Sequence, residues 1–371
     1  MKILIIQDFL RSGGTERQTV LLANAFAAAG HDVTLLTFRP GGALDATVHA
    51  AVKRHALQPF DFHLDWCAPG LARFTARTEP DVILCMGRMA NCYARRAQLS
   101  RLGPAHGTNV PGSPAAKLVM TMRTGKPLPW NFRRGLQHAD TVVANSRDAA
   151  ATLEQTYAVS PQKISVIHNS LVFPAAATLT RNEALRAQHG ATPATTVLLC
   201  VAMFRPEKNQ RELIEIAAGL PPEADWQLWL AGEGPARTGC ETLVRENKLE
   251  ARVKFLGFQS NPSALYAAAD IAVHASWSEA LSNFLIEAQA HGLPAVAYQA
   301  QGIEECFRPG RTGWAIARDD RAAFRVAVVH CMRASPATRS ALAAEAQAYA
   351  RENFDSARQV QAYLQLFQRL F

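Results

Sequence analysis

The sequence predicts two successive α/β domains, each built around a parallel sheet with helices on both faces. Its 371 residues are enough for two ordinary domains. Short runs of β-branched residues alternate with helical stretches, which is the pattern of parallel sheets buried on both sides. The alternation loosens around residues 172–194 and then starts again, which indicates a linker near residue 180.

The first series opens with a β-turn-α-β unit. "KILIIQ" is a buried strand, "LRSGG" is a glycine turn and "DVTLLT" is a second strand. The helix between them has Thr15 and Gln18 at the spacing of a capping box and Gly30 as its stop. Further strands are expected at 80–86, 117–123, 139–146 and 163–169.

The second series also alternates strands with helices. Its strands are "TTVLLCVAMF", "DWQLWLAGEG", "RVKFLGF", "DIAVHAS" and "PAVAYQ", and its helices are expected at 208–219, 236–247, 262–268 and 282–291. The last segment, "SARQVQAYLQLFQRLF", predicts an amphipathic helix that could belong to either domain. Ligands bind at the carboxyl ends of strands in open parallel sheets, so the cleft between two such domains is the expected site.

Composition and charge narrow the class of protein. A hydrophobic content of 49% and a charged content of 19% are typical of a soluble globular protein. The sequence opens without a signal-peptide pattern and has no apolar run near ~20 residues, so a cytoplasmic location is expected. Seven scattered cysteines without zinc-like spacing suit reduced core thiols.

The net charge of +8 is unevenly spread. The segment 73–134 carries eleven Lys and Arg residues against only Glu79 and Asp81. Such a segment attracts phosphates on a nucleic acid, a lipid headgroup or a small ligand, and it could equally be a solvated basic face.

Three short motifs could approach a phosphate-bearing ligand. In "RSGGTE", Gly13 and Gly14 allow close approach before a helix N-terminus, although a tight turn with positive φ also fits. In "FRPEKNQ", Arg205 and Lys208 follow a strand and could hold a diphosphate or be surface charges. In "AGEGP", the glycines suit either a flat ligand or a simple turn.

The fourth motif is "SEALSNFLIEAQAHGLPAVAYQ". Glu279 lies before a short helix and Glu287 lies within its second turn. The N–H groups near Leu281, Ser282 and Asn283 can hold a phosphate, while a carboxylate accepts hydrogen bonds from hydroxyl groups. The chemistry implied is a sugar or ribose joined to phosphate; the alternative is two solvated surface acids.

Together these motifs resemble the retaining glycosyltransferases of family 4, which have the GT-B fold. The acid-x7-acid pair is preceded by "FLGF" and "ADIAVHAS" and followed by "GLPAVA". "ANS", "VIHNS", "RPEKN", "LAGEGP" and "QGIEECFRPGRTGW" follow the family's order. The resemblance implies an N-terminal acceptor domain at 1–175, a nucleotide-sugar domain at 176–355 and a helix at 356–371 that packs back on the first domain.

The resemblance also implies roles for residues of this sequence. Glu287 would hold the ribose hydroxyls, Glu279 a hydroxyl of the transferred sugar, and Arg205 and Lys208 the diphosphate. The remaining implied nucleotide-binding positions are Gly13, Gly14, Gly232, Glu233, Leu281, Ser282 and Asn283. No metal and no cofactor are expected, and a UDP-sugar is favoured over a GDP-sugar as donor.

Two departures from the family pattern concern basic residues. Family members often have an arginine where this chain has Met203, so Arg205 would substitute from a shifted position. A histidine near the reacting sugar is common in the family. The corresponding stretch "VMTMRTG" offers Arg123 instead, and His106 is the other candidate.

The acceptor is indicated only by composition. "PLPWNFRRG" combines Trp130, Phe132, Arg133 and Arg134, which suits an anionic membrane surface and a glycan or lipid-linked acceptor, or else an ordinary loop. An epimerase of the same fold and an inactive donor-binding subunit are the alternative functions. A phosphorylase is disfavoured because no lysine follows Lys254, and no motif supports nucleic-acid binding.

Overall fold

The chain contains two parallel sheets with helices around them. A computed structural model describes residues 1–99, 116–173 and 179–371. One compact unit contains residues 1–169 and 357–371, and the other contains residues 170–356. Among the helices of the described residues, none is long and apolar enough to cross a membrane.

The first unit contains a seven-stranded sheet in the order β3-β2-β1-β4-β5-β6-β7, in which every neighbouring pair is parallel. The strands are β1 (Lys2–Gln7), β2 (Asp32–Thr37), β3 (Lys53–Ala56), β4 (Val82–Cys85), β5 (Lys117–Met122), β6 (Thr141–Ala144) and β7 (Ile164–Val166). The strand order reverses between β1 and β4, which is the topological switch point of this sheet.

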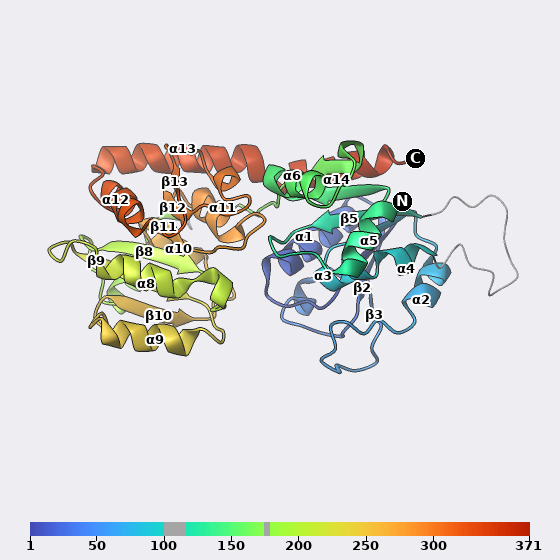
Figure 1. Cartoon of the computed structure of the whole chain (residues 1–371), viewed down its shortest axis with the longest axis horizontal. Coiled ribbons are helices and arrows are strands. Elements are labelled where there is room, and N and C mark those ends of the chain that lie inside the picture. The colour runs from blue at the N-terminus through green and yellow to red at the C-terminus, as the bar shows by residue number, and fades with distance from the viewer. Residues whose placement is uncertain (100–115, 174–178) are drawn as a thin grey trace, which may run out of the picture. The chain divides into compact units, whose positions relative to one another are not determined.

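Helices cover both faces of this sheet (Figure 1). They are α1 (Gly14–Ala28), α2 (Leu71–Thr78), α3 (Arg88–Cys92), α4 (Ala94–Leu99), α5 (Trp130–His138), α6 (Arg147–Gln155) and α14 (Ser356–Gln368). Ile3 and Ile5 pack into one hydrophobic cluster, whereas Leu4 and Ile6 pack into the other. Strand β1 is therefore apolar at all four positions, because both of its faces are buried.

Helix α14 packs on α1 although some 330 residues separate them in the sequence. The ring of Phe26 contacts Tyr363 and Phe367 at centroid distances of 6.1 and 5.7 Å. Gln359 also donates a hydrogen bond to Gln18, at 3.0 Å. These contacts bury an apolar face of α14 against the N-terminal segment, so the last helix completes the first unit.

The start of α1 differs from the expected capping box. The helix begins at Gly14 with Gly13 as N-cap, and Thr15 is already inside it. No side chain caps this helix end, and the Thr15 carbonyl accepts a hydrogen bond from Thr19 instead. The capping-box prediction is therefore wrong, because the two glycines allow the helix to start two residues earlier.

The second unit contains a six-stranded parallel sheet in the order β10-β9-β8-β11-β12-β13. Its strands are β8 (Thr196–Val201), β9 (Trp226–Ala231), β10 (Val253–Gly257), β11 (Ile271–His274), β12 (Ala295–Tyr298) and β13 (Gly313–Ile316). The order reverses between β8 and β11, so this pair of strands forms the switch point. Both sheets confirm the predicted doubly wound class.

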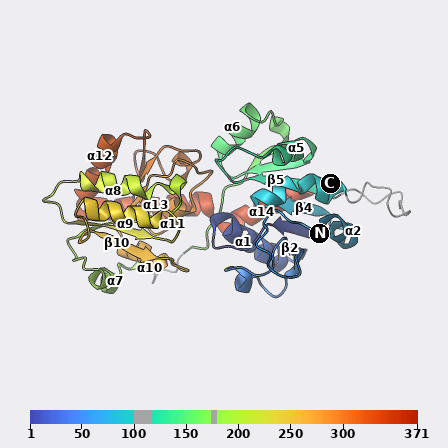
Figure 2. The same cartoon turned by 60° about the horizontal axis from the view of Figure 1, so that its bottom comes forward.

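Seven α-helices accompany this sheet in the described residues. They are α7 (Glu183–Gln188), α8 (Gln210–Ala218), α9 (Arg237–Glu246), α10 (Ser263–Ala268), α11 (Asn283–Ala290), α12 (Arg321–Met332) and α13 (Pro336–Phe354). Figure 2 shows α8 and α9 side by side, and α11 packs against α13. Two hydrophobic clusters, one on each face, bury the sheet.

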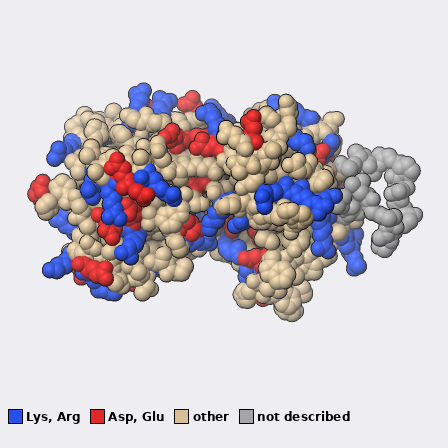
Figure 3. Space-filling model, viewed as in Figure 1, with Lys and Arg blue, Asp and Glu red and all other residues tan. Residues whose placement is uncertain are grey.

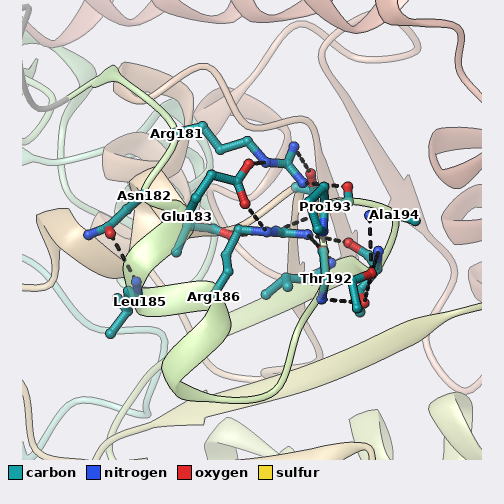
Figure 4. Close-up of polar contacts among 12 residues, drawn as sticks. Arg181, Asn182, Glu183, Leu185, Arg186, Thr192, Pro193 and Ala194 are labelled. Atoms are coloured by element: carbon teal, nitrogen blue, oxygen red, sulfur yellow. Dashed lines mark hydrogen bonds and ion pairs between the residues drawn. The ribbon is translucent and has the colours of Figure 1, made fainter.

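A fully buried arginine fixes α7 to this sheet. Arg186 donates hydrogen bonds to the carbonyls of Ala268 (2.7 Å) and Thr192 (2.9 Å) and pairs with Asp270 at 3.0 Å. Figure 4 shows its guanidinium reaching from the helix to the segment around Thr192 and Pro193. Asp270 in turn accepts the backbone N–H of Val197 at 2.8 Å. The ion pair thus joins α7 to the starts of β8 and β11.

Candidate functional site

The switch point of the second sheet brings two loops together at the carboxyl ends of β8 and β11. A 3-10 turn, Pro206–Lys208, follows β8, and the loop of residues 275–282 leads from β11 to α11. The hydroxyl of Ser276 and the backbone N–H of Trp277 both donate to the carbonyl of Glu207, at 2.9 and 3.1 Å. The two loops therefore form one hydrogen-bonded surface at the edge where such sheets bind ligands.

Three polar side chains meet on this surface. The ammonium Nζ of Lys208 lies 2.5 Å from Oε1 of Glu279, and Nε2 of His274 lies 2.8 Å from the same oxygen. Glu279 is 8% exposed and His274 is 1% exposed. The structure thus brings together two of the residues expected from the sequence, Lys208 and Glu279, and adds His274.

The surroundings of Glu279 keep its carboxylate ionised. Burial alone would raise its pKa, but the charge of Lys208 and the hydrogen bond of His274 hold the pKa well below its ordinary range. Both contacts fall on Oε1. Oε2 has no partner among the described residues and is not fully buried, so it can accept a hydrogen bond from a ligand.

The N-terminus of α11 lies directly after Glu279. Ser282 is its N-cap and accepts the N–H of Leu285 at 3.4 Å, and Asn283 is the first helical residue. Leu281 is buried and fixes the chain just before the cap. The first N–H groups of a helix lack carbonyl partners within it, so they favour an anion here.

Glu287 lies in the second turn of α11, as expected. Its Oε2 accepts a hydrogen bond from the hydroxyl of Tyr266 at 2.6 Å, and the Tyr266 ring stacks on His291 with centroids 4.7 Å apart. These contacts hold the carboxylate in one position on the helix. A fixed carboxylate can accept hydrogen bonds from vicinal hydroxyl groups such as those of ribose.

The other residues expected in this domain have different surroundings. Arg205 is exposed and makes no side-chain hydrogen bond or ion pair within the described residues. Gly232 has φ of +143°, and a Cβ there would collide with the carbonyl of Ala202. The turn therefore requires this glycine for close packing of two backbone loops. Glu233 is exposed and pairs with Arg237 of α9.

In the first unit, the glycine turn carries no positive φ. Gly13 is extended, with φ of −73°, and Gly14 is the first residue of α1. The carboxylate of Glu16 lies where a Cβ of Gly13 would be. The Glu16 carboxylate thus occupies the space that a side chain at position 13 would need. The tight-turn alternative with positive φ is wrong, because neither glycine has a positive φ.

Arg123 follows β5 and bonds to two polar side chains of the same unit. It donates to Oδ1 of Asn169 at 2.5 Å and to the Tyr363 hydroxyl of α14 at 2.9 Å. These bonds tie the end of β5 to the last helix. The second candidate for the family's histidine, His106, lies outside the described residues.

Sequence reasoning missed His274 and Asp8. His274 ends the apolar strand run "DIAVHAS", where a histidine looks like a core residue. Asp8 directly follows β1 and accepts the N–H groups of Met89 and Ala90, at 3.1 and 2.6 Å. Both residues stand at the carboxyl end of a switch-point strand, which is the signal that could have indicated them.

Comparison with known proteins assigns the class and then the family. The model of "Glycosyltransferase Family 4" matches residues 12–171, and the model of "Glycosyl transferases group 1" matches residues 181–348. Two doubly wound units in this order form the GT-B fold, and the two family models assign the chain to the glycosyltransferases. The chain belongs to glycosyltransferase family 4, the group 1 glycosyltransferases.

Individual relatives agree with this assignment. The lipopolysaccharide core biosynthesis glycosyltransferase LpsD of Rhizobium meliloti (strain 1021) is 28% identical over 377 residues, covering 100% of this chain and 98% of LpsD. The N-acetyl-alpha-D-glucosaminyl L-malate synthase of Bacillus anthracis is 32% identical over 130 residues, covering 35% of this chain and 34% of that protein. Anabaena HepE, solved with UDP-glucose, is 22% identical with a TM-score of 0.80, and all of both chains is covered.

Proposed function

We propose that this glycosyltransferase moves a sugar from a UDP-sugar to a saccharide or lipid-linked saccharide acceptor, with retention at the anomeric carbon. The second unit would bind the donor and the first unit the acceptor. Support comes from the UDP-glucose in HepE and from the role of LpsD in the lipopolysaccharide core. The observation that carries the proposal is the contact of Lys208 with Glu279 at the β8–β11 switch point.

Lys208 can serve the leaving group while it holds Glu279. An ammonium has three N–H donors, and the contact with Glu279 uses one of them. Negative charge grows on the diphosphate as the glycosidic bond breaks, so a fixed cation there stabilises the transition state more than the ground state. The exposed guanidinium of Arg205 and the N–H groups at the start of α11 would help to stabilise this negative charge on the diphosphate.

The two acids would divide the donor between them. Oε2 of Glu279, which has no partner in the described part of the chain, would accept a hydroxyl of the transferred sugar. Glu287, held by Tyr266, would accept the ribose hydroxyls. Since the two residues are eight positions apart around one helix start, sugar and ribose would flank the diphosphate.

The first test is calorimetric titration of the protein with UDP, GDP and ADP and with their common sugar conjugates. We expect one nucleotide, UDP, to bind at micromolar concentration. Glu287→Ala should weaken this binding at least about tenfold, because removal of one charged hydrogen-bond acceptor costs ~1.5–3 kcal/mol. Glu250→Ala, which removes an exposed acid of the same unit, is the matched control and should bind UDP like the wild type.

Two results would contradict the proposal. If no nucleotide binds, the unit has the fold without a donor site. If Glu287→Ala binds UDP as well as Glu250→Ala does, Glu287 does not hold the ribose. Turnover of the UDP-sugar to its epimer without release of UDP would favour the epimerase alternative.

A basic surface over α5 supports a membrane-bound acceptor. Figure 3 shows Lys and Arg side chains gathered over α5 of the first unit. Trp130 is 62% exposed, and the Arg134 guanidinium lies 5.2 Å from its ring centre. Phe132 is instead buried in the core, so it does not belong to this surface. Burial lowers the pKa of His138, and the charges of Arg95, Arg134 and Lys163 act in the same direction.

We therefore propose that the protein docks peripherally on an anionic membrane, at its cytoplasmic face, through α5. The protein should bind phosphatidylglycerol vesicles at low salt and detach as salt screens the charges. Arg133→Ser with Arg134→Ser should reduce binding, whereas Arg333→Ser with Arg339→Ser, two exposed residues of the other unit, should not. Equal binding by both double variants would exclude α5 as the docking surface.

A further inference from the structure

We infer that His274 is a positioning residue of the donor-sugar site, whose Nε2–H holds Oε1 of Glu279 and leaves Oε2 to the sugar hydroxyl. The inference rests on the proposed function, because it assigns Glu279 to the transferred sugar. It goes further by making the buried histidine responsible for the orientation of that carboxylate.

The contact is buried and well placed. His274 is the last residue of β11, is 1% exposed, and has the Phe284 ring of α11 at a centroid distance of 5.6 Å. Its Nε2 lies 2.8 Å from Oε1 of Glu279, five residues further along the chain. Because the imidazole is enclosed on a strand, it offers the carboxylate a donor at a fixed point.

The surroundings of the two ring nitrogens indicate which of them donates a hydrogen bond. Nδ1 is buried and has no hydrogen-bond partner among the residues that the structure describes. The ionised carboxylate of Glu279 can only accept a hydrogen bond, so the hydrogen of this contact lies on Nε2. His274 is therefore the donor to Glu279.

Two donors on one oxygen fix the carboxylate. Lys208 reaches Oε1 from the β8 side of the switch point and His274 reaches it from the β11 side. Lys208 sits on a long flexible side chain and would also contact the diphosphate, so it cannot fix the rotation of the carboxylate alone. The imidazole supplies the missing constraint. The effect should concern the sugar and not the nucleotide, because Glu287 would hold the ribose.

Two substitutions of similar polarity separate the two ring positions. His274→Gln places a side-chain amide near the position of Nε2, whereas His274→Asn places it near Nδ1, short of Glu279. We would compare their affinities for UDP and for the UDP-sugar that the wild type hydrolyses, among UDP-glucose, UDP-galactose and UDP-N-acetylglucosamine. Turnover is measured as UDP release with water as acceptor, which needs no identified acceptor.

We expect all variants to bind UDP like the wild type. His274→Asn should lower UDP release between about 10- and 100-fold and reduce the affinity for the UDP-sugar, while His274→Gln should recover most of both. The double variant His274→Asn with Glu279→Gln should be no worse than Glu279→Gln alone, because the histidine acts through that carboxylate.

Three outcomes would overturn the inference while the proposed function stands. These are wild-type activity of His274→Asn, an equal loss in His274→Gln and His274→Asn, and full additivity with Glu279→Gln. A wild-type protein that binds no UDP would overturn the proposed function itself, and this inference with it.

Discussion

Asp8 is a buried carboxylate whose pKa is set by two opposing effects, burial and hydrogen bonding. Its carboxylate follows β1, accepts two N–H groups at the start of α3, and leaves no room for a side chain at Gly87. Burial raises its pKa to about 6, although the two N–H donors lower it. A buried acid thus lies at the switch point of the first sheet, whereas the Lys208–Glu279 pair lies at the switch point of the second sheet.

This raised pKa makes stability depend on pH in a defined direction. Between pH ~4 and ~6 the folded state binds more protons at Asp8 than the unfolded state does, so the free energy of unfolding falls as pH rises. Asp8→Asn keeps one of the two acceptor oxygens, replaces the other with an amide NH2 group, and removes the charge. Its stability relative to the wild type should therefore increase by roughly 3 kcal/mol across this window.

Urea unfolding of both proteins between pH 4 and 8 measures this difference. Asp320, the N-cap of α12, accepts the N–H of Ala323 at 2.8 Å and is exposed, so Asp320→Asn is the matched control. No comparable change is expected for the control. A difference between Asp8→Asn and wild type that stays constant with pH would show that Asp8 is charged throughout the range.

At the scale of elements, α7 depends on one buried ion pair for its attachment. The guanidinium of Arg186 satisfies backbone carbonyls and the carboxylate of Asp270, whose side chain is only 7% exposed. Arg181 pairs with the same Asp270 at 2.9 Å, but its side chain is 38% exposed. The two arginines therefore share a partner and differ mainly in burial.

Arg186→Met should lower the free energy of unfolding by ~3–5 kcal/mol, because it leaves a buried carboxylate and carbonyls without their donor. Arg181→Met should cost no more than about 1 kcal/mol, as is usual for an exposed ion pair. Denaturant unfolding of the two variants tests this contrast. Similar losses in both would show that the attachment of α7 does not depend on burial of the pair.

At the scale of the whole molecule, the first unit needs the last helix. Phe367 is fully buried against Phe26, whereas Phe371, a few residues further on, is 63% exposed. Phe367→Ala should destabilise this unit by ~3–5 kcal/mol through the cavity it leaves, and Phe371→Ala should be close to neutral.

Amide hydrogen exchange can locate this effect. Phe367→Ala should accelerate exchange in β1 and α1 and leave β8, β9 and β11 of the other unit unchanged. Equal acceleration in both units would mean that they unfold together, contrary to their separate hydrophobic clusters.

Most of the fold could be predicted because buried strands are recognisable in the sequence as runs of apolar residues. The strands that escaped prediction are edge strands with a different composition. β3 has the sequence "KRHA" and is largely exposed, and β13 has "GWAI" with most of its residues only partly buried. These segments are strands because they pair with β2 and β12, respectively. The local sequence pattern does not show such pairing.

The site was predictable to the extent that spacing specifies it. The positions of Glu279 and Glu287 around the start of α11 follow from their distance along the chain and the helix signals. The partnership of Glu279 with Lys208 joins residues 71 positions apart, and only the strand order places them together. His274 was missed because a histidine inside an apolar strand looks like a core residue, and its contact with Glu279 depends on how the intervening loop folds.

The place of α14 in the first unit also has a consequence for synthesis on the ribosome. Residues 170–356 form one uninterrupted stretch, so the second unit can fold as soon as it has emerged. The first unit is translated earlier, yet its surface around Phe26 stays uncovered until residues 357–371 leave the exit tunnel. The half of the protein that is made first is therefore completed last, and in the meantime its exposed apolar surface is a natural target for chaperones.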